Sequence, residues 1–229
     1  PVDRRQRQMC IRDSNWVELS HEENKNYFCV VDLHSLTTHP NPETMEENIF
    51  ETIKVLVASG INLKNSNIYI QSNVSEHVQL SWILSNFCQI GELQRMTQFK
   101  EKADQLGNHA GILTYPVLMA ADILIHKANE VPVGDDQTQH LELTRNIVER
   151  FNNTYGEIFP LPDKKTGAVG ARLMSLRHPE NKMSKSNDDL NGTIYFDDSK
   201  DEIIKKFKSS VTDSENEIKF DIDLSLIHI

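Results

Sequence analysis

Short apolar runs that alternate with helical segments constrain the fold of this chain more than any other feature. The runs at 27–31, 67–70 and 131–133 are rich in aromatic and β-branched residues, which favours buried strands. Segments with helical spacing or helix-start signals lie between and after these runs, at about 41–60, 75–87, 92–103, 115–127, 137–151 and 199–208. We therefore expect an α/β fold with a parallel sheet that carries helices on both faces.

Cap residues set the expected helix boundaries. Ser75 and Ser199 are expected to cap the helices that follow them, and Asp135 or Asp136 is expected to cap the helix that runs to about residue 151. Pro116 is expected in the first turn of the helix 115–127, where its missing N–H is tolerated. Val78, Trp82 and Leu84 are available for packing in the helix 75–87.

Polar residues follow two of the predicted strands directly. Asp32-Leu33-His34 comes after the first run, and Gly134-Asp135-Asp136-Gln137 comes after the third. Ligands of parallel α/β sheets bind beyond the carboxyl ends of the strands. These two segments are therefore candidate parts of a ligand site.

Charge and cysteine content exclude several classes of protein. The 229 residues carry 24 basic and 34 acidic side chains, a net charge of −10, which argues against a general nucleic-acid coat. The three cysteines are far apart and lack zinc spacing, which fits a reducing cytoplasm. The longest apolar stretch, 112–125, is too short to span a bilayer and contains Asp122, so we expect no membrane partner.

The most informative motif for function is Lys182-Met183-Ser184-Lys185-Ser186, in a polar segment without strand or helix periodicity. Two ammonium groups and two hydroxyls on a loop suit a polyphosphate, because lysines act as point charges and hydroxyls donate hydrogen bonds. The simpler interpretation of such a segment is a solvated basic loop.

Asp122 is a carboxylate inside an apolar helix, where it needs a hydrogen-bond donor. Tyr115, Met119 and Asp122 share one helical face, which could form the wall of a pocket for a flat apolar ring with a single N–H, such as indole. The structural alternatives are an aspartate paired with an arginine or capping a neighbouring helix, and Met119 as a core residue.

The segment Gly134–Gln137 is the second candidate constellation. Gly134 allows close approach of a ligand, a carboxylate at a helix start can accept from ribose hydroxyls, and the Gln137 amide can contact a charged substrate group. The alternative is a plain helix cap followed by a polar turn.

Several strings together resemble bacterial tryptophanyl-tRNA synthetase, a class I aminoacyl-tRNA synthetase. They are Gly91–Lys102, Leu113–Pro116, Leu118–Leu124, Val131–Gln137, Val169–Arg172 and Lys182–Ser186, and they keep the family's order from roughly 15 to 218. The string Gly134–Gln137 is shared with the tyrosyl enzymes, whereas Met96–Lys100 and Ala120–Asp122 point to the tryptophanyl branch.

This resemblance implies a Rossmann-like catalytic domain with a helical insertion at about 75–112, in a homodimeric enzyme. It also implies ATP-dependent activation of L-tryptophan and transfer to tRNA(Trp). Mg²⁺ would bind mainly through the phosphates of ATP, and no metal site made by the protein is expected.

The resemblance also implies roles for individual residues. Asp122 would accept the indole N–H, Met119 and His34 would line the ring pocket, and Tyr115 and Gln137 would hold the substrate's ammonium group. The residues implied in ATP binding are Gly134, Asp136, Leu173, Lys182, Met183, Ser184, Lys185 and Ser186. Among these, Asp136 would bind the ribose, and Lys182, Ser184 and Lys185 would act catalytically on the departing pyrophosphate.

The chain departs from the family pattern at both ends. The family's first signature, a Pro-Ser/Thr-Gly turn followed by a His-x-Gly-His-like motif, does not precede the strand at 27–31, and His109-Ala110-Gly111 is no substitute. Residues 1–14 and 219–229 do not match the family, and within them the strings 8–14 and 224–229 resemble translated sequencing adapters. We therefore expect a fragment that lacks the first strand and the C-terminal helical domain and is poorly soluble and nearly inactive by itself.

Three alternatives stay open at the level of sequence. The nearest is a tyrosyl-tRNA synthetase, and the second is a non-catalytic paralogue that binds tryptophan or a nucleotide. The third is a tRNA-binding module, against which the net charge of −10 weighs. Lys205, Lys206 and Lys208 could meet an acceptor stem, although a solvated helix face is the simpler interpretation.

Overall fold

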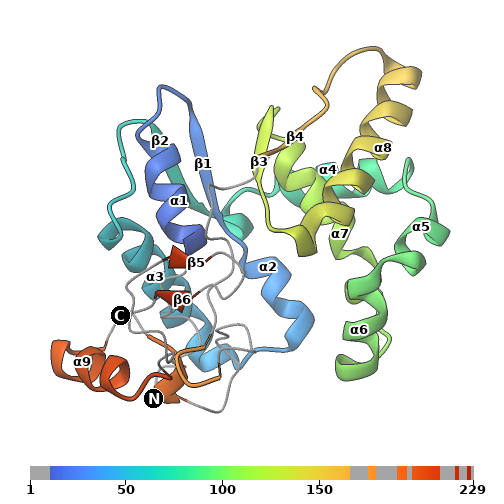
Figure 1. The fold of residues 1–229 in the computed structure, drawn as a ribbon. Helices are drawn as coiled ribbons and strands as arrows, with labels where there is room; N and C mark the ends of the chain where they lie inside the picture. Colours follow the sequence, from blue (N-terminus) through green and yellow to red (C-terminus); the bar gives the residue numbers. More distant parts are fainter. Residues whose placement is uncertain are drawn as a thin grey trace. The chain divides into compact units, whose positions relative to one another are not determined.

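The computed structural model describes residues 11–165, 175–178, 190–194, 198–211, 220–221 and 226–227 (Figure 1). These residues fall into two compact units. One comprises 11–26, 43–66 and the described part of 167–229, and the other comprises 27–42 and 67–165. The second unit holds most of the predicted site residues.

The second unit alternates short strands with helices, as the sequence predicts. Its elements are β1 (Asn26–Val30), α2 (Asp32–Ser35), the 3-10 turn η2 (Leu36–Thr38), β2 (Ser66–Ile70), the 3-10 turn η3 (Gln71–Asn73), α4 (Glu76–Ser85), α5 (Ile90–Arg95), α6 (Thr97–Leu106), α7 (Ala110–Leu124), β3 (Glu130–Pro132), the 3-10 turn η4 (Asp135–Gln137), α8 (Thr138–Tyr155) and β4 (Asp163–Lys165). Strand β1 is the hydrogen-bonded neighbour of β2, and β3 pairs in parallel with β4, with Val131 opposite Lys164.

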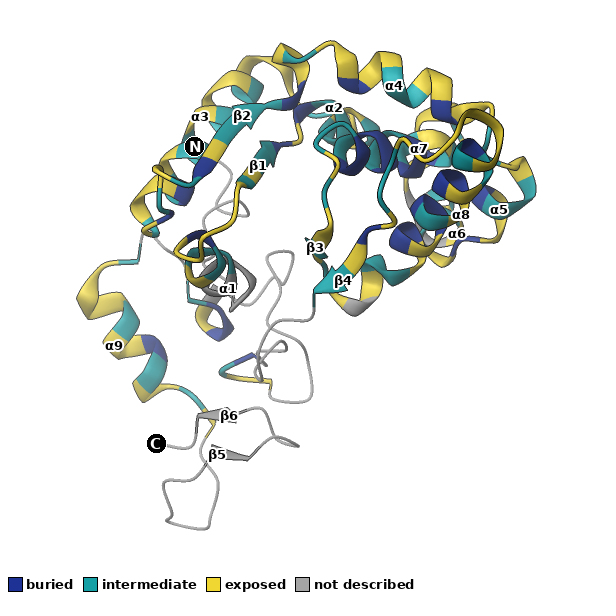
Figure 2. Ribbon diagram, turned by 90° about the horizontal axis from the view of Figure 1, so that it is seen from above, coloured by how far each residue is buried: buried dark blue, intermediate teal, exposed yellow. Residues whose placement is uncertain are grey.

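Helix α7 forms the centre of this unit, and α4, α5, α6 and α8 pack against it. Figure 2 shows buried residues along α7 and α8 in dark blue. The core is apolar and comprises Leu84, Leu93, Met96, Val117, Ala120, Ala121, Ile123, Leu124, Leu141, Leu143, Ile147, Val148 and Phe151. The apolar stretch around Asp122 is therefore a core helix, as the sequence predicts.

The expected position of Pro116 is wrong. Helix α7 begins at Ala110, so Pro116 lies inside it and is buried. A proline in a helix interior removes one backbone hydrogen bond and costs about 3 kcal/mol. Burial of Ile112, Val117 and Leu124, at about 1.5–3 kcal/mol for each such side chain, outweighs that cost.

The helix expected at 92–103 is two helices. Met96 has an extended backbone (φ −63°, ψ 132°), ends α5 and precedes α6. Its side chain is buried in the core next to Leu93. The break between α5 and α6 therefore falls at a residue whose apolar side chain belongs to the core.

One expected cap is confirmed in position only, and another is wrong. Ser75 stands at the N-cap of α4 but makes no side-chain capping bond, and the N-cap of α8 is Gln137 rather than an aspartate. The turn η4 precedes α8, and the Gln137 N–H donates to the Gly134 carbonyl at 3.0 Å. Of the three α4 residues expected to pack, Leu84 is buried, whereas Val78 is 52% and Trp82 75% exposed.

The first unit contains α1 (Ile11–Ser20), α3 (Pro42–Ala58), the 3-10 turn η5 (Leu190–Gly192), α9 (Lys200–Lys208), and the antiparallel strands β5 (Phe220–Asp221) and β6 (Leu226–Ile227). Helix α9 begins as predicted, because Ser199 and Glu202 form a capping box. Gly60 follows α3 with φ of +97°, a backbone conformation that favours glycine. Within the described ranges, no helix has the length and apolar character needed to cross a membrane.

Candidate functional site

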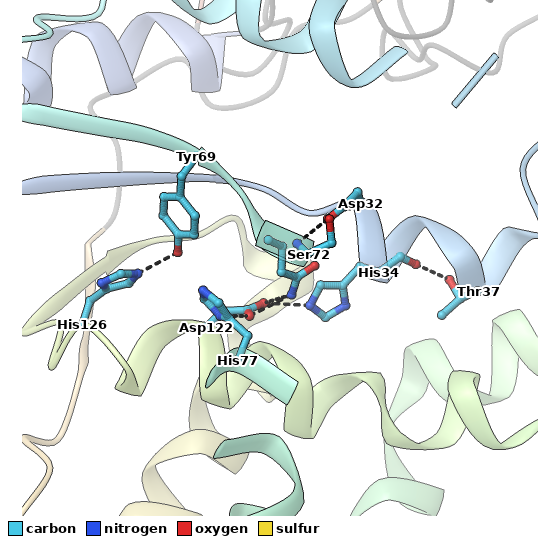
Figure 3. Close-up of polar contacts among 9 residues, drawn as sticks. Asp32, His34, Thr37, Tyr69, Ser72, His77, Asp122 and His126 are labelled. Carbon is cyan, nitrogen blue, oxygen red and sulfur yellow. Dashed lines mark hydrogen bonds and ion pairs between the residues drawn. The ribbon is translucent and has the colours of Figure 1, made fainter. Parts of the chain in front are cut away.

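The Asp122 carboxylate is bound by three side chains from other elements (Figure 3). Its Oδ1 accepts from Nδ1 of His77 at 2.7 Å and from Nε2 of Gln71 at 2.8 Å. Its Oδ2 accepts from Nε2 of His34 at 2.8 Å and from the same Gln71 amide at 3.0 Å. None of these partners is an arginine, so the arginine-paired alternative for Asp122 finds no support among the residues that the structure describes.

Strands β1 and β2 bring two of these partners, His34 and Gln71, to Asp122. His34 lies in α2 directly after β1, and Gln71 lies in η3 directly after β2. The buried Asp32 side chain ties the two segments together, because its Oδ1 accepts from the Ser72 N–H at 3.0 Å. The third partner, His77, comes from the first turn of α4. Polar groups at the carboxyl ends of strands thus meet at one place, as expected for such a sheet.

A layer of aromatic and titratable side chains surrounds His77. The Tyr69 hydroxyl bonds His126 Nε2 at 2.6 Å, and Tyr27 stacks on His126 with ring centroids 4.1 Å apart. Burial, together with the nearby His77, lowers the pKa of His126, and burial raises the pKa of Tyr69. Burial also raises the pKa of the Cys29 thiol to about 12. At neutral pH the layer is therefore uncharged at these three groups.

A cleft of about 240 Å³ lies beside His34, one of the three partners of Asp122. Its lining comprises Leu33, His34, Leu36, Thr37, His39, His109, Gly111, Thr114, Tyr115 and Leu118. His34 therefore faces the cleft on one side and bonds Asp122 on the other. Of the residues predicted to contact a substrate, His34 and Tyr115 line this cleft, whereas Asp122, Met119 and Gln137 do not.

Tyr115 connects this region to the segment after β3. Its hydroxyl donates to Oε1 of Gln98 at 3.0 Å and contacts Nε2 of His140 at 2.9 Å. The Gln98 amide in turn donates to the Asp136 carbonyl at 2.9 Å. Burial raises the pKa of Tyr115 to about 12, so its hydroxyl stays protonated at neutral pH.

The segment Gly134–Gln137 presents a carboxylate on the turn η4. Asp136 is exposed, and its Oδ2 accepts from the Gln137 amide at 3.2 Å. A Cβ on Gly134 would lie 2.7 Å from Asp136 Oδ1, so this tight turn requires glycine unless the carboxylate moves. The exposed Asp136 carboxylate can accept hydrogen bonds from sugar hydroxyls.

The remaining predicted residues differ in their surroundings. Met119 is partly buried and packs against the apolar core. The segment Lys182–Ser186 and Leu173 lie outside the described residues. In the part of the chain that the structure describes, no group of three or more His, Cys, Asp or Glu side chains could hold a metal ion.

Four site residues were missed by the sequence reasoning. Gln71 had a usable signal, because it follows a predicted strand directly, as His34 does. His77, Gln98 and His140 had none. Their partners lie 45, 17 and 25 positions away along the chain, and no local pattern links them.

Comparisons with known proteins show which family the chain belongs to. The family model described as tRNA synthetases class I (W and Y) matches residues 9–227. The tryptophan–tRNA ligase of Wolinella succinogenes is 47% identical over 208 residues, which cover 90% of this chain and 63% of that protein. The chain thus spans less than two thirds of the length of the curated relatives that it matches.

Solved structures give the same result. Tryptophanyl-tRNA synthetase from Mycoplasma pneumoniae has a TM-score of 0.83 and 36% identity, covering 96% of this chain and 66% of that chain. The enzyme from Campylobacter jejuni, complexed with ADP and tryptophan, has a TM-score of 0.79 and 33% identity, covering 90% of this chain and 65% of that chain. The predicted α/β, Rossmann-like fold class is confirmed. The chain belongs to the family of class I tRNA synthetases for tryptophan and tyrosine, and its sequence is of the bacterial tryptophanyl type.

Proposed function

We propose that the protein containing this chain activates L-tryptophan with ATP and transfers the activated amino acid to tRNA(Trp). The observation that carries the proposal is the Asp122 carboxylate, which is mostly buried and is held by His34, His77 and Gln71, with no arginine among its partners in the described ranges. A desolvated acceptor of this kind favours a ligand with a ring N–H and disfavours rings without one. The named tryptophanyl relatives support the same substrate.

The indole is proposed to bind on the His34 side of Asp122. Gln71 and His77 are fully buried, whereas His34 lines the cleft and bonds Oδ2. Met119 and His34 would line the ring pocket, as the family resemblance implies. Tyr115 and Gln137 would hold the ammonium group, for which the neutral Tyr115 hydroxyl and the Gln137 amide supply acceptor oxygens.

The first chemical step is the formation of tryptophanyl-adenylate. The carboxylate of tryptophan, already ionised at neutral pH, attacks the α-phosphorus of ATP. The bond from that phosphorus to the bridging oxygen breaks, and pyrophosphate leaves with the electron pair. No general base is needed, so the protein's work is to position both substrates and to stabilise charge on the pyrophosphate.

The second step transfers the amino acid. A terminal ribose hydroxyl of tRNA(Trp) attacks the carbonyl carbon of the adenylate and loses its proton to solvent. The bond from that carbon to the phosphate oxygen breaks, and AMP leaves. The products are tryptophanyl-tRNA and AMP.

Nucleotide binding is proposed to use two segments. Gly134 and Asp136 would receive the ribose, which fits the exposed carboxylate and the tight turn described above. Leu173 and the segment Lys182–Ser186 would contact ATP, with Lys182, Ser184 and Lys185 acting on the pyrophosphate. Mg²⁺, bound mainly through phosphate oxygens, would supply further neutralisation of charge.

The resemblance supports the remaining proposals. We assign residues 15–218 to the catalytic domain, with a helical insertion at about 75–112. The protein is proposed to be a cytoplasmic homodimer, and light scattering of the purified protein would measure its mass.

Amino-acid-dependent exchange of pyrophosphate into ATP tests the proposed function. The full-length gene product should exchange in the presence of tryptophan and not tyrosine. Exchange with tyrosine alone would support a tyrosyl enzyme, and tryptophan binding without exchange would support a non-catalytic paralogue.

The Asp122→Asn variant tests the proposed ring contact. An amide is a weaker acceptor, and its NH₂ group would meet the donors of His34, Gln71 or His77. We expect the KM for tryptophan to rise about tenfold or more, since hydrogen bonds to charged groups contribute about 1.5–3 kcal/mol. Asp104→Asn, at an exposed position of α6, is the matched control. An unchanged KM and unchanged selectivity in Asp122→Asn would remove this residue from substrate recognition.

A further inference from the structure

His77 is a fully buried histidine whose ring has one partner and one bare nitrogen. Its Nδ1 lies 2.7 Å from Asp122 Oδ1, and its Nε2 is buried without a hydrogen-bond partner among the described residues. An ionised carboxylate only accepts hydrogen bonds, so the ring hydrogen belongs on Nδ1. The lone pair then lies on Nε2. In this tautomer the N–H of the ring points at the Asp122 carboxylate.

The ring of His77 is also fixed in orientation. It stacks on Tyr69 with centroids 5.6 Å apart and an interplanar angle of 25°, and His126 meets it edge-on at 5.9 Å. Its backbone N–H donates to the Val74 carbonyl at the start of α4. Packing and backbone together hold Nδ1 on the Asp122 carboxylate.

The two carboxylate oxygens of Asp122 have different surroundings. Oδ1 accepts from His77 and Gln71, which are both 0% exposed. Oδ2 bonds His34, whose side chain is 17% exposed and lines the cleft. Each oxygen has two contacts, because the Gln71 amide also lies 3.0 Å from Oδ2, but Oδ2 alone has a partner that lines the cleft. Oδ2 is then the oxygen on the substrate side.

We propose that His77 is a positioning residue for substrate recognition, which binds Oδ1 and thereby turns Oδ2 of Asp122 toward the ring N–H of the amino acid. The inference rests on the proposed function, because it names the group that sets the direction of the acceptor. Metal sites use the same arrangement, in which a residue that does not touch the metal hydrogen-bonds to a ligand and fixes that ligand's orientation. His77 does not touch the substrate and acts through Asp122.

Two substitutions separate this role from simple packing. His77→Asn retains an N–H close to the place of Nδ1, whereas His77→Gln carries its amide to the place of Nε2. Both are measured in the full-length gene product by tryptophan-dependent exchange, with separate KM values for tryptophan and ATP. The competing substrate is the tryptophan analogue in which sulfur replaces the ring N–H.

His77→Gln is expected to raise the KM for tryptophan about tenfold or more over His77→Asn, the range of one hydrogen bond to a charged group. The KM for ATP should stay unchanged, and the preference for tryptophan over the sulfur analogue should fall by the same factor. His77→Asn should retain that preference. Gln79→Ala, on the exposed side of α4, should match the wild type in every parameter.

Equal losses in both variants, or an unchanged preference in both, would overturn the proposal in favour of a packing role. Should neither variant fold, nitrogen-15 NMR of the histidine rings in the wild type decides the question. An Nδ1–H tautomer of His77 supports the proposal, and an Nε2–H tautomer overturns it. Absence of tryptophan-dependent exchange in the wild type would instead refute the proposed function, while the tautomer stays measurable.

Discussion

Burial keeps two cysteine thiols of this chain protonated at neutral pH. The pKa of the Cys29 thiol is raised to about 12 and that of Cys88 to about 11, in each case chiefly by loss of solvent. Nearby carboxylates raise both further, Asp122 and Asp32 at Cys29 and Glu92 at Cys88. Because the thiolate is the reactive form, both cysteines should be poor nucleophiles in the folded protein.

Alkylation with iodoacetamide at pH 8 measures this effect. We expect Cys29 and Cys88 to react roughly a hundred- to a thousandfold more slowly in the native than in the denatured protein, since each pKa unit lowers the thiolate fraction about tenfold. Cys29 should be the slower of the two. Peptide mass spectrometry gives both rates, and equal native and denatured rates would contradict the prediction.

Asp122 was predictable from the sequence because a charged residue in an apolar run conflicts with its surroundings. Such a conflict requires partners, and the residue types that could supply them are few. The partners themselves could not be predicted, because Gln71 and His77 lie 51 and 45 positions from Asp122 in the chain. Only the paired strands and the packing of α4 against α7 bring them together.

At the scale of elements, local signals succeeded where they were complete. Helix α9 begins at its predicted cap because Ser199 and Glu202 carry both halves of a capping box. Lys206, which the sequence offered as a candidate for tRNA contact, is instead buried and paired with Asp198 at 2.6 Å. Helix α7 was misjudged because the local preference of Pro116 was overridden by burial of the whole helix.

An ion pair joins α5 and α8. Arg150 donates from both terminal nitrogens to Glu92, each at 2.7 Å, and Glu92 also closes the capping box of α5. The hydrogen bonds from Arg150 are the main cause of a lowered pKa of Glu92. A carboxylate with a lowered pKa stabilises the folded protein above its ordinary pKa, and the contribution is lost as the pH falls through the lowered value.

Glu92→Gln should therefore lower the free energy of unfolding at pH 7 by about 1–2 kcal/mol, between the values for exposed ion pairs and buried charged hydrogen bonds. The difference from the wild type should persist down to about pH 4.5, the ordinary value for glutamate, and shrink below it. Urea unfolding at several pH values measures this. The exposed Glu142→Gln is the control, and a difference that grows at low pH would contradict the assignment.

At the scale of the whole molecule, charge limits how the protein can meet tRNA. With a net charge of −10, the chain repels a polyanion at long range, so attraction must come from a local set of basic groups. Such contacts release counterions, and the logarithm of affinity then falls linearly with the logarithm of salt concentration. Tryptophan is a zwitterion and releases none. The two substrates of the proposed reaction should therefore respond differently to salt.

We expect the logarithm of kcat/KM for tRNA to fall with the logarithm of salt concentration with a slope on the order of −1 to −3, which corresponds to few phosphate contacts. The KM for tryptophan should stay nearly constant. Aminoacylation and exchange assays on the full-length protein, run across one salt series, measure both. Lys205→Ala combined with Lys208→Ala should leave the slope unchanged, since both side chains are exposed on α9 and a solvated face is the simpler interpretation. A slope shallower by one or two in that variant would place α9 on the tRNA, and a steep slope in the wild type would require a basic surface larger than a local set.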